Sequence, residues 1–331
     1  MFFSIIIPLY NRPQEIRELL ASLEKQLYKD FEVIIVEDGS TVPAADIVRS
    51  FQDRLYIHYF VKENEGQGFA RNYGFAHAKG DYFIVFDSDV IVPNDYLQQV
   101  LKGLEVEKWD AFGGPDAAHD SFTVMQKAIS YSMTSPFTTG GIRGNKKHVG
   151  QFHPRSFNMG LSRVVYNQTR GFKLSRRSED IEFSIRMLEE GFRVGLIPDA
   201  FVYHKRRTNL VQFFKQTYSF GKGRIDIFKL YPKELKAVHA LPTVFVLGLF
   251  CLILLSLANA CTAGACLPLS ILTQIGGLFL ALYTAFLFLH AWSVTKHLYV
   301  ACLSVLAAYT QLIAYGTGFI VNFVQRILLK K

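Results

Sequence analysis

The distribution of charge constrains this chain more than any other feature of its sequence. All 28 acidic residues precede Ala237, whereas the stretch from Val238 to the C-terminus carries only four formal charges, Lys296, Arg326, Lys330 and Lys331. The mean hydropathy of +0.17 is high for a soluble protein. The chain therefore consists of a water-soluble part and an apolar part suited to lipid. This division excludes a wholly soluble enzyme, a disordered protein and a nucleic-acid binder that works by bulk charge.

Cysteine usage and the start of the chain indicate where the soluble part resides. Cys251, Cys261, Cys266 and Cys302 all lie in the apolar part, so the soluble part has neither a disulfide framework nor a cysteine-based zinc site. For Cys261 and Cys266 we expect two buried, unpaired thiols, with a disulfide between them as the alternative in an oxidising space. Residues 1–10 lack the basic start and the long apolar core of a signal peptide, so we expect a cytoplasmic soluble part.

Short apolar runs alternate with helical patterns in the first part of the chain. Strands are predicted over 2–9, 31–36, 55–60 and 82–86, and helices from Pro13 onward and over 68–78. This alternation predicts a mostly parallel sheet covered by helices on both faces. Ligands bind such sheets beyond the carboxyl ends of the strands, where this sequence has Tyr10-Asn11-Arg12, Glu37-Asp38 and Asp87-Ser88-Asp89. The pattern indicates a nucleotide-type site.

The following segment, residues 113–170, is rich in Gly, Ser, Thr and Asn and shows little periodicity. An irregular stretch of this length inside a compact domain usually carries function, so we expect a functional surface there. A helix over 178–190 and a strand over 194–197 are predicted next, and the polar run Tyr203-His204-Lys205-Arg206-Arg207 follows.

Residues 205–236 carry nine Lys or Arg and only two acidic residues, with aromatic and aliphatic residues between them. This composition is typical of helices that lie on an anionic membrane surface, with an ordinary solvated helix as the alternative. We therefore expect three regions: a soluble α/β domain over 1–204, a basic amphipathic interface segment over 205–237 and a transmembrane region over 238–331.

The transmembrane region contains two or three membrane helices. Residues 242–260 and 267–289 are each long enough to cross the ~30 Å hydrocarbon core. A third candidate, 299–323, is broken by Gly316-Thr317-Gly318, and its crossing would put the positive charges after it outside, against the usual bias. Three crossings fit the length, and two crossings with a re-entrant or surface-lying segment fit the charge. Both topologies stay open at this point.

Asp87 and Asp89 come directly after a predicted strand and are two residues apart. On extended backbone their carboxylates point the same way, and such a pair suits a hard divalent cation that also binds a diphosphate. Turn capping would explain two acids, but it would not explain the further polar residues Glu37, Asp38 and Arg71 in neighbouring elements. We therefore favour a cation site.

Four ordered blocks carry most of these residues: SIIIPLYNR (4–12), IIVEDGS (34–40), GFARNYGFAHAKGDYFIVFDSD (68–89) and SEDIEFSIRMLEEGF (178–192). In order and spacing they resemble the blocks of family 2 glycosyltransferases, whose GT-A fold has a Rossmann-like, mostly parallel sheet. The further pieces TTGGIRG (138–144), RSFNMG (155–160) and VYHKRR (202–207) are similar to a membrane-anchored bacterial branch with apolar helices after the catalytic domain.

The resemblance implies a role for each matching residue. It implies nucleotide contacts for Tyr10, Asn11, Asp38, Arg71 and Asp87, and Mg²⁺ or Mn²⁺ binding by Asp89, Asp87 and His204. The pair Glu179-Asp180 is catalytic in this interpretation, with Asp180 matching the general base of inverting members. Its place near a helix N-terminus favours the ionised carboxylate that a base requires. We assign five residues to the acceptor or diphosphate side: Arg143, Asn158, Arg207, Gln216 and Arg224.

The sequence departs from the family pattern at two positions. Glu37 stands where Asp is usual and reaches further, and Ser178 stands where Gly commonly precedes the acidic pair. We expect Ser178 to cap the following helix. The Gln-x-x-Arg-Trp block of processive relatives is absent from the segment around Gln216, which argues against a processive polymerase.

These observations predict a multi-pass protein of the inner membrane with a cytoplasmic catalytic domain. We expect an inverting glycosyltransferase that moves a sugar from a nucleotide donor, a UDP-sugar by preference, to a hydroxyl of a lipid-linked or cell-surface glycan. One alternative is a polyprenyl-phosphate sugar transferase, whose phosphate acceptor needs no general base. The other is a non-catalytic nucleotide-binding subunit of a glycan assembly or transport complex. Nucleic acid is not an expected partner.

Overall fold

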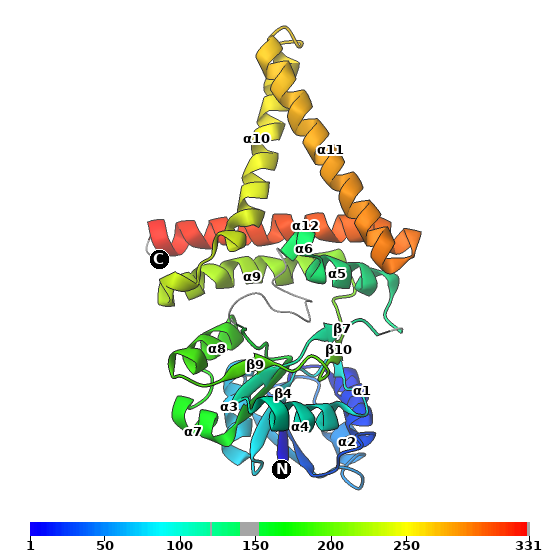
Figure 1. Cartoon of the computed structure of the whole chain (residues 1–331), viewed down its shortest axis with the longest axis vertical. Coiled ribbons are helices and arrows are strands. Elements are labelled where there is room, and N and C mark those ends of the chain that lie inside the picture. Colours follow the sequence, from blue (N-terminus) through cyan, green and yellow to red (C-terminus); the bar gives the residue numbers. More distant parts are fainter. Residues whose placement is uncertain (120, 140–151, 330–331) are drawn as a thin grey trace. The chain divides into compact units, whose positions relative to one another are not determined.

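The computed structural model of the chain describes residues 1–119, 121–139 and 152–329. Residues 1–119 and 152–205 form one compact unit, and residues 121–139 and 206–329 form a second. Figure 1 labels the elements of each unit. Residues 121–139 thus belong to the second unit, although they lie within the α/β domain predicted over 1–204.

A seven-stranded sheet forms the core of the first unit, in the order β3-β2-β1-β4-β8-β6-β9. Its strands are β1 (Phe3–Leu9), β2 (Phe31–Asp38), β3 (Ile57–Lys62), β4 (Tyr82–Phe86), β6 (Ala111–Gly113), β8 (Asn158–Ser162) and β9 (Val194–Leu196). Only β8 runs antiparallel to its neighbours among the described strands of this sheet. The mostly parallel sheet that the alternating pattern predicts is confirmed.

Helices cover both faces of this sheet, which is why β1 and β2 are buried at every residue. Successive residues of a strand point to opposite faces. Ile5 and Ile7 of β1 therefore pack with one set of helices and Ile6 with the other. The first set comprises α1 (Pro13–Glu24), α2 (Ala45–Arg49) and α4 (Tyr96–Glu107). The second comprises α3 (Gln67–His77), α7 (Arg163–Thr169) and α8 (Glu179–Glu189).

A small second sheet lies at the carboxyl end of β4. It has the order β5-β10-β7, with β5 (Val90–Ile91), β7 (Asp116–Ala117) and β10 (Val202–His204). The pairing of β10 with β5 is antiparallel and places His204 opposite Val90. This pairing brings His204 next to the turn that contains Asp87 and Asp89, more than a hundred residues earlier in the chain.

The expectation of an irregular stretch over 113–170 is wrong for its described residues. They include β7, β8 and α7 as well as α5 (Val124–Thr134) and α6 (Pro136–Thr139). The helix α5 is buried at consecutive positions from Ala128 to Met133, so its sequence has no single apolar stripe. Without such a stripe the helical period is weak in the sequence.

The second unit is helical in its described part. It contains α5, α6, α9 (Leu210–Leu230), α10 (Leu241–Cys261), α11 (Leu267–Thr295) and α12 (Leu298–Phe323), with short helical turns at Pro232–Glu234, Ala237–Ala240 and, as η3, Val324–Leu328. Three helical stretches, Ala237–Cys261, Leu267–Thr295 and Leu298–Leu328, are long and apolar enough to cross a membrane. The four cysteines are unpaired and exposed. Unpaired thiols at Cys261 and Cys266 are therefore confirmed, whereas their expected burial is wrong.

The contact between β6 and β8 generates a prediction about stability. A β-carbon at Gly160 would lie 2.0 Å from Cε1 of the Phe112 ring. We expect Gly160→Ala to destabilise the domain by about 1–3 kcal/mol, because the packed interior cannot take up the extra volume. The measurement is thermal unfolding of the full chain in detergent, followed by Trp109 fluorescence in a Trp292→Phe background, since the sequence has two tryptophans.

The control for this variant is the pair of changes Gly160→Ala and Phe112→Leu. Replacing the ring by the smaller leucine side chain makes room for the new methyl group. The double variant should therefore lose less free energy of unfolding than the sum of the two single losses. Additive losses would contradict the packing explanation.

Candidate active site

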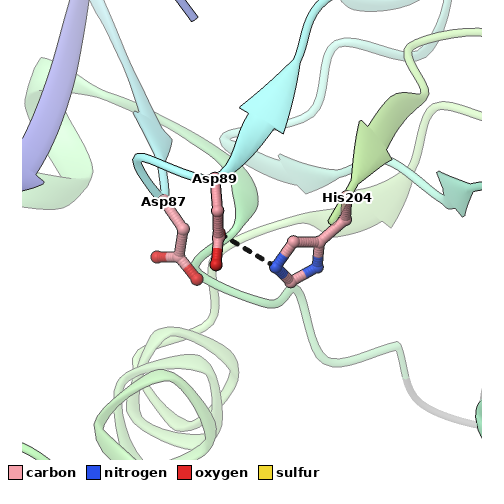
Figure 2. A group of neighbouring side chains, drawn as sticks. All are labelled: Asp87, Asp89 and His204. Atoms are coloured by element: carbon pink, nitrogen blue, oxygen red, sulfur yellow. Dashed lines mark ion pairs between the residues drawn. The ribbon is translucent and has the colours of Figure 1, made fainter. Parts of the chain in front are cut away.

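Three side chains that can ligate a metal meet at the carboxyl end of β4. Asp87 and Asp89 follow β4 and His204 ends β10, and Figure 2 shows the three side chains together. One ligand atom from each lies within 4.8 Å of the other two. His204 Nε2 is 3.2 Å from Asp89 Oδ1, and the imidazole stacks on the Phe157 ring at a centroid distance of 4.8 Å. The Lys205 amide donates to the Asp89 carbonyl at 3.0 Å, which holds the two segments together.

The donor set fits a divalent cation. Asp89 Oδ1 and His204 Nδ1 are buried, and neither has a hydrogen-bond partner among the described residues. Carboxylate oxygens are the ligands that Mg²⁺ and Mn²⁺ prefer, and imidazole is a common additional ligand for Mn²⁺. A cation bound here would have Asp89 Oδ1 and His204 Nε2 as ligands, two atoms that face each other at 3.2 Å.

A positively charged side chain, Arg12, already neutralises part of the charge of this cluster. The Arg12 guanidinium donates to Asp89 Oδ2 and is only 29% exposed. Burial by itself would raise the pKa of Asp89, but the neighbouring His204 and Arg12 side chains outweigh it and hold that pKa well below its usual range. From the sequence, Arg12 was expected only as part of the polar cluster Tyr10-Asn11-Arg12, and its contact with Asp89 was not predicted. The signal was its position after β1, which pairs with β4.

The fully buried Arg71 of α3 connects the two halves of the site. Its Nη2 lies 2.7 Å from Asp87 Oδ1, and its Nη1 lies 3.0 Å from Glu179 Oε1. Burial by itself would lower the pKa of Arg71, but the charges of Asp87 and Glu179 raise it. The guanidinium therefore stays charged and sets the positions of both carboxylates.

The two acids at the start of α8 have different surroundings. Glu179 is 4% exposed and accepts from Gln67 and Arg71. Burial and the neighbouring charge of Asp180 raise the pKa of Glu179. Asp180 is 18% exposed, and its Oδ2 lies 3.7 Å from Arg155 Nη1. Asp180 is therefore the more accessible carboxylate of the pair.

The expected cap at Ser178 is wrong. Ser178 precedes α8 but has a φ of +60°, and its side chain makes no capping hydrogen bond. This left-handed conformation turns the hydroxyl away from the free amides of the first turn. It is also a conformation that glycine adopts more readily, which accounts for the glycine of the family pattern at this position.

Residues expected to contact the nucleotide line the ends of β1 and β2. Tyr10 is 51% exposed. Asn11 adopts a φ of +52°, and its Oδ1 accepts from the Thr41 and Val42 amides. Asp38 is buried and accepts from the Glu65 and Gly66 amides at 3.0 and 2.8 Å. Asn11 and Asp38 thus hold the loops around the site, and nucleotide contacts for these three residues stay predictions.

Glu37 points away from this loop network. Its carboxylate accepts from the Tyr59 hydroxyl and from the Ala44 amide, the latter at 2.9 Å. Burial and the bonded carboxylate raise the pKa of Tyr59 well above its usual range. The longer side chain of Glu37 therefore serves the packing of β2, β3 and α2.

The residues assigned to the acceptor side are distributed over the chain. Asn158 is fully buried in β8, where its Oδ1 accepts from the Tyr96 hydroxyl at 2.5 Å and its Nδ2 donates to the Ala200 carbonyl at 2.8 Å. Arg207, Gln216 and Arg224 belong to the second unit. Arg143 lies outside the described residues. The structure therefore gives Asn158 a clear packing role, and acceptor contacts for all five stay predictions.

Comparison with known proteins decides the family. Residues 4–169, half of the chain, match the family model described as glycosyl transferase family 2. The chain belongs to glycosyltransferase family 2. It is 38% identical over 102 residues to an uncharacterized glycosyltransferase of Rickettsia felis, a stretch that covers 31% of this chain and only 17% of that protein.

Two further similarities cover more of this family 2 chain. A Methanococcus voltae protein, dolichyl N-acetyl-α-D-glucosaminyl phosphate 3-β-D-2,3-diacetamido-2,3-dideoxy-β-D-glucuronosyltransferase, is 25% identical over 257 residues, 70% of this chain and 78% of that protein. The solved structure of mannosyltransferase PcManGT from Pyrobaculum calidifontis, in complex with GDP-Man and Mn²⁺, superposes with a TM-score of 0.62 at 20% identity. That alignment covers 94% of this chain and 86% of PcManGT and shows the GT-A fold.

The contact between Arg12 and Asp89 generates a prediction about metal binding. Arg12→Gln removes the cation that now neutralises Asp89, so we expect Mn²⁺ to bind about tenfold more tightly without nucleotide. The measurement is an electron paramagnetic resonance titration of free Mn²⁺ with the full chain. Arg17→Gln is the matched control, because Arg17 is an exposed residue of α1 and its change alters the net charge equally. Equal Mn²⁺ affinities in the two variants would show that Arg12 does not compete for the cation site.

Proposed function

We propose that this protein is a membrane-anchored inverting glycosyltransferase. It takes a sugar from a nucleotide-sugar donor and transfers it to a hydroxyl group of a lipid-linked or cell-surface glycan. The observation that carries the proposal is the cluster of Asp87, Asp89 and His204 at the carboxyl end of β4, with ligand atoms within 4.8 Å of one another. Its position in a family 2 chain with the GT-A fold supports a cation site for the donor diphosphate.

On the donor side, Asp87, Asp89 and His204 would hold Mg²⁺ or Mn²⁺. Such a cation supplies positive charge to the leaving diphosphate. Arg71 keeps the Asp87 carboxylate in place, and Arg12 keeps the Asp89 carboxylate ionised. The exposed ring of Tyr10, with Asn11 and Asp38 holding the loops around it, is our candidate for the nucleotide base.

On the acceptor side, Asp180 is the general base. It accepts the proton of the acceptor hydroxyl while that oxygen bonds to the anomeric carbon and the bond from this carbon to the donor phosphate breaks. Attack opposite to the leaving nucleoside diphosphate inverts the anomeric configuration. Arg155 and the first turn of α8 place positive charge beside the Asp180 carboxylate. Glu179 acts as a positioning residue, because it is buried against Arg71 and Gln67.

The chain's apolar helices suit an acceptor that is itself held in a membrane. The name of the Methanococcus voltae relative describes transfer to a dolichyl-linked sugar phosphate, which supports a lipid-linked acceptor here. We place α10 and α11 in the inner membrane and the first unit in the cytoplasm, because nine basic residues between Lys205 and Lys236 precede α10.

Donor binding should depend on the metal and on Asp89. We expect Asp89→Asn to abolish Mn²⁺-dependent binding of the nucleoside diphosphate. The variant should also unfold at a lower temperature, because Asp89 is buried and paired with Arg12 and His204. Calorimetric titrations with UDP and with GDP, each with Mg²⁺ or Mn²⁺, measure the affinity and test our preference for UDP. Asp53→Asn, an exposed acid after α2, is the control with the same charge change. Unchanged nucleotide affinity in Asp89→Asn would contradict the assignment of Asp89 as a metal ligand.

Turnover should depend on Asp180. We expect Asp180→Asn to lower kcat by roughly 10² to 10⁴, with little loss of donor affinity, because a positioned base is worth about this much. The assay is release of the nucleoside diphosphate in the presence of a lipid-linked acceptor, with Asp199→Asn as the exposed control. Normal turnover in Asp180→Asn would favour the polyprenyl-phosphate transferase, whose acceptor needs no base. No release by the unsubstituted chain with any donor would favour the non-catalytic subunit.

A further inference from the structure

The helix α12 differs from the other two candidate membrane helices in how it is packed. Half of its most apolar window is buried inside the structure, compared with 6% for α11 and none for α10. Its buried residues are mainly small, among them Ala301, Ser304, Ala307, Gly316 and Gly318. They lie on more than one side of the helix, because Gly316 meets Pro242 of α10 whereas Gly318 meets Tyr218 of α9. A helix packed in this way has protein, and not lipid, beside much of its surface.

The helix that α12 contacts over most of its length is α9. A β-carbon at Gly221 would lie 2.1 Å from the Tyr315 carbonyl oxygen, and one at Gly318 would lie 2.2 Å from the Tyr218 carbonyl oxygen. The two backbones therefore touch at two places. Asn322, which is 1% exposed, extends the contact, because its Nδ2 donates to the Lys222 carbonyl at 2.7 Å and to Asp226 Oδ1 at 2.8 Å.

Helices α9 and α12 are parallel, and successive residues of α9 contact successive residues of α12. Phe213 of α9 packs with Ala307 of α12, Gly221 lies against Tyr315, and Asp226 bonds with Asn322. At 1.5 Å per residue, the shared length is about 20 Å. Whatever depth α12 has in a bilayer, α9 must therefore follow it over that length.

The charges of α9 oppose a membrane crossing by this pair. The helix carries Lys215, Lys222, Arg224, Asp226 and Lys229. Ala307 is near the middle of α12, so a crossing α12 would bring Lys215, two residues after Phe213, close to the bilayer centre. Ionised side chains are expensive at that depth. They are favourable at the surface, where lysine and arginine contact anionic headgroups.

The contacts of α12 with α10 and α11 show how α12 is oriented relative to the hairpin that these two helices form. These two helices are joined by the short segment 262–266, and they meet beside the middle of α10, where a β-carbon at Gly276 would lie 2.7 Å from Leu252. At the opposite, open end, α12 meets the first turn of α10 through Gly316 and Pro242, and the last turns of α11 through Ala301 and Ala291. Ala301 and Gly316 are about 22 Å apart along α12. The helix therefore lies across the open end of the hairpin (Figure 1).

We propose that α12 lies in the plane of the membrane interface and does not cross the bilayer. Its buried side rests on α9, and its exposed apolar residues, among them Leu298, Tyr299 and Leu306, contact the acyl chains below anionic phospholipid headgroups. The membrane anchor then has two crossings, α10 and α11, and both ends of the second unit lie on the same side of the membrane. The inference rests on the proposed membrane insertion of α10 and α11 and not on the chemistry of the first unit.

This arrangement also resolves the conflict between helix length and charge. Lys296 precedes α12, and Arg326, Lys330 and Lys331 follow it. With α12 in the interface, all four positive charges stay on the side of the basic segment 205–236, as the charge bias of membrane proteins favours.

The first test is cysteine accessibility in spheroplasts that express the full chain. The four natural cysteines are replaced by serine, and three single-cysteine variants are made: Cys261 restored, Gln325→Cys and Asp53→Cys. Cys261 reports the closed end of the hairpin, Gln325 is an exposed polar residue after α12, and Asp53 is an exposed residue of the first unit. We expect an impermeant maleimide to label Cys261 in intact spheroplasts and the other two only after permeabilisation.

Each other outcome is decisive. Labelling of both Cys261 and Gln325→Cys in intact spheroplasts would mean that α12 crosses, which overturns the inference and leaves the anchor in place. Failure to label Cys261 before permeabilisation would mean that the hairpin itself does not cross, and both the anchor and the inference would fall.

The second test measures depth directly. Spin labels are attached at Leu298, Leu306 and Leu328, exposed residues of α12 and η3, in vesicles of phosphatidylcholine and phosphatidylglycerol. Oxygen and nickel-complex accessibilities should give the three labels the same depth within a few ångströms. Labels at Leu247 and Leu254 of α10, also exposed, serve as the matched control and should differ by about 10 Å, seven residues at 1.5 Å each. A label at Leu306 that is much deeper than the other two of α12 would contradict an in-plane helix.

Discussion

The geometry of the candidate active site depends on one buried cation. Arg71 has no exposed surface, and its guanidinium lies between Asp87 and Glu179, the latter 108 residues further along the chain. An ion of this size loses several kcal/mol of hydration when it is buried, so it is tolerated only with both carboxylates in hydrogen-bonding positions. This requirement joins the end of β4 to the start of α8. Asp89 and Asp180 each lie within two residues of one of the two bonded acids, so the guanidinium fixes the spacing between the proposed donor and acceptor sides.

Strands β1 to β4 of the main sheet were predictable as apolar runs, most of which end in polar clusters, and β9 was also predicted. Strands β6 and β8 were missed, because they are short and β8 contains Asn158 and Gly160. Burial on both faces removes the need for alternation, so β1 and β2 stand out in the sequence without any alignment. The small sheet could not be predicted in this way. Its strands β5 and β7 have two residues each, and a pattern needs more positions to be visible. His204 was expected at the metal site from the family resemblance, whereas its pairing opposite Val90 became visible only in the fold.

The contacts that the sequence did not reveal are those between residues far apart in the chain. Asp87 and Asp89 were found because they are two residues apart, but Arg12 reaches Asp89 across the pairing of β1 with β4. Asn158 was assigned to the acceptor or diphosphate side as part of the family-like piece RSFNMG, whereas its amide bonds with Tyr96 and Ala200 in the interior. The hydropathy of α12 predicted its length, but its small buried face has meaning only beside α9.

The divergence of α10 and α11 has a consequence for the lipid bilayer itself. The two helices are joined at one end and have α12 between them at the other. With α12 in the interface, the anchor occupies a larger cross-section in one leaflet than in the other. In a convex leaflet the headgroups are spread apart, and a body that is wider in that leaflet fills the extra area, so it favours convex membrane on the side of α12. The anchor would then respond to the curvature and lateral pressure of the membrane that holds it.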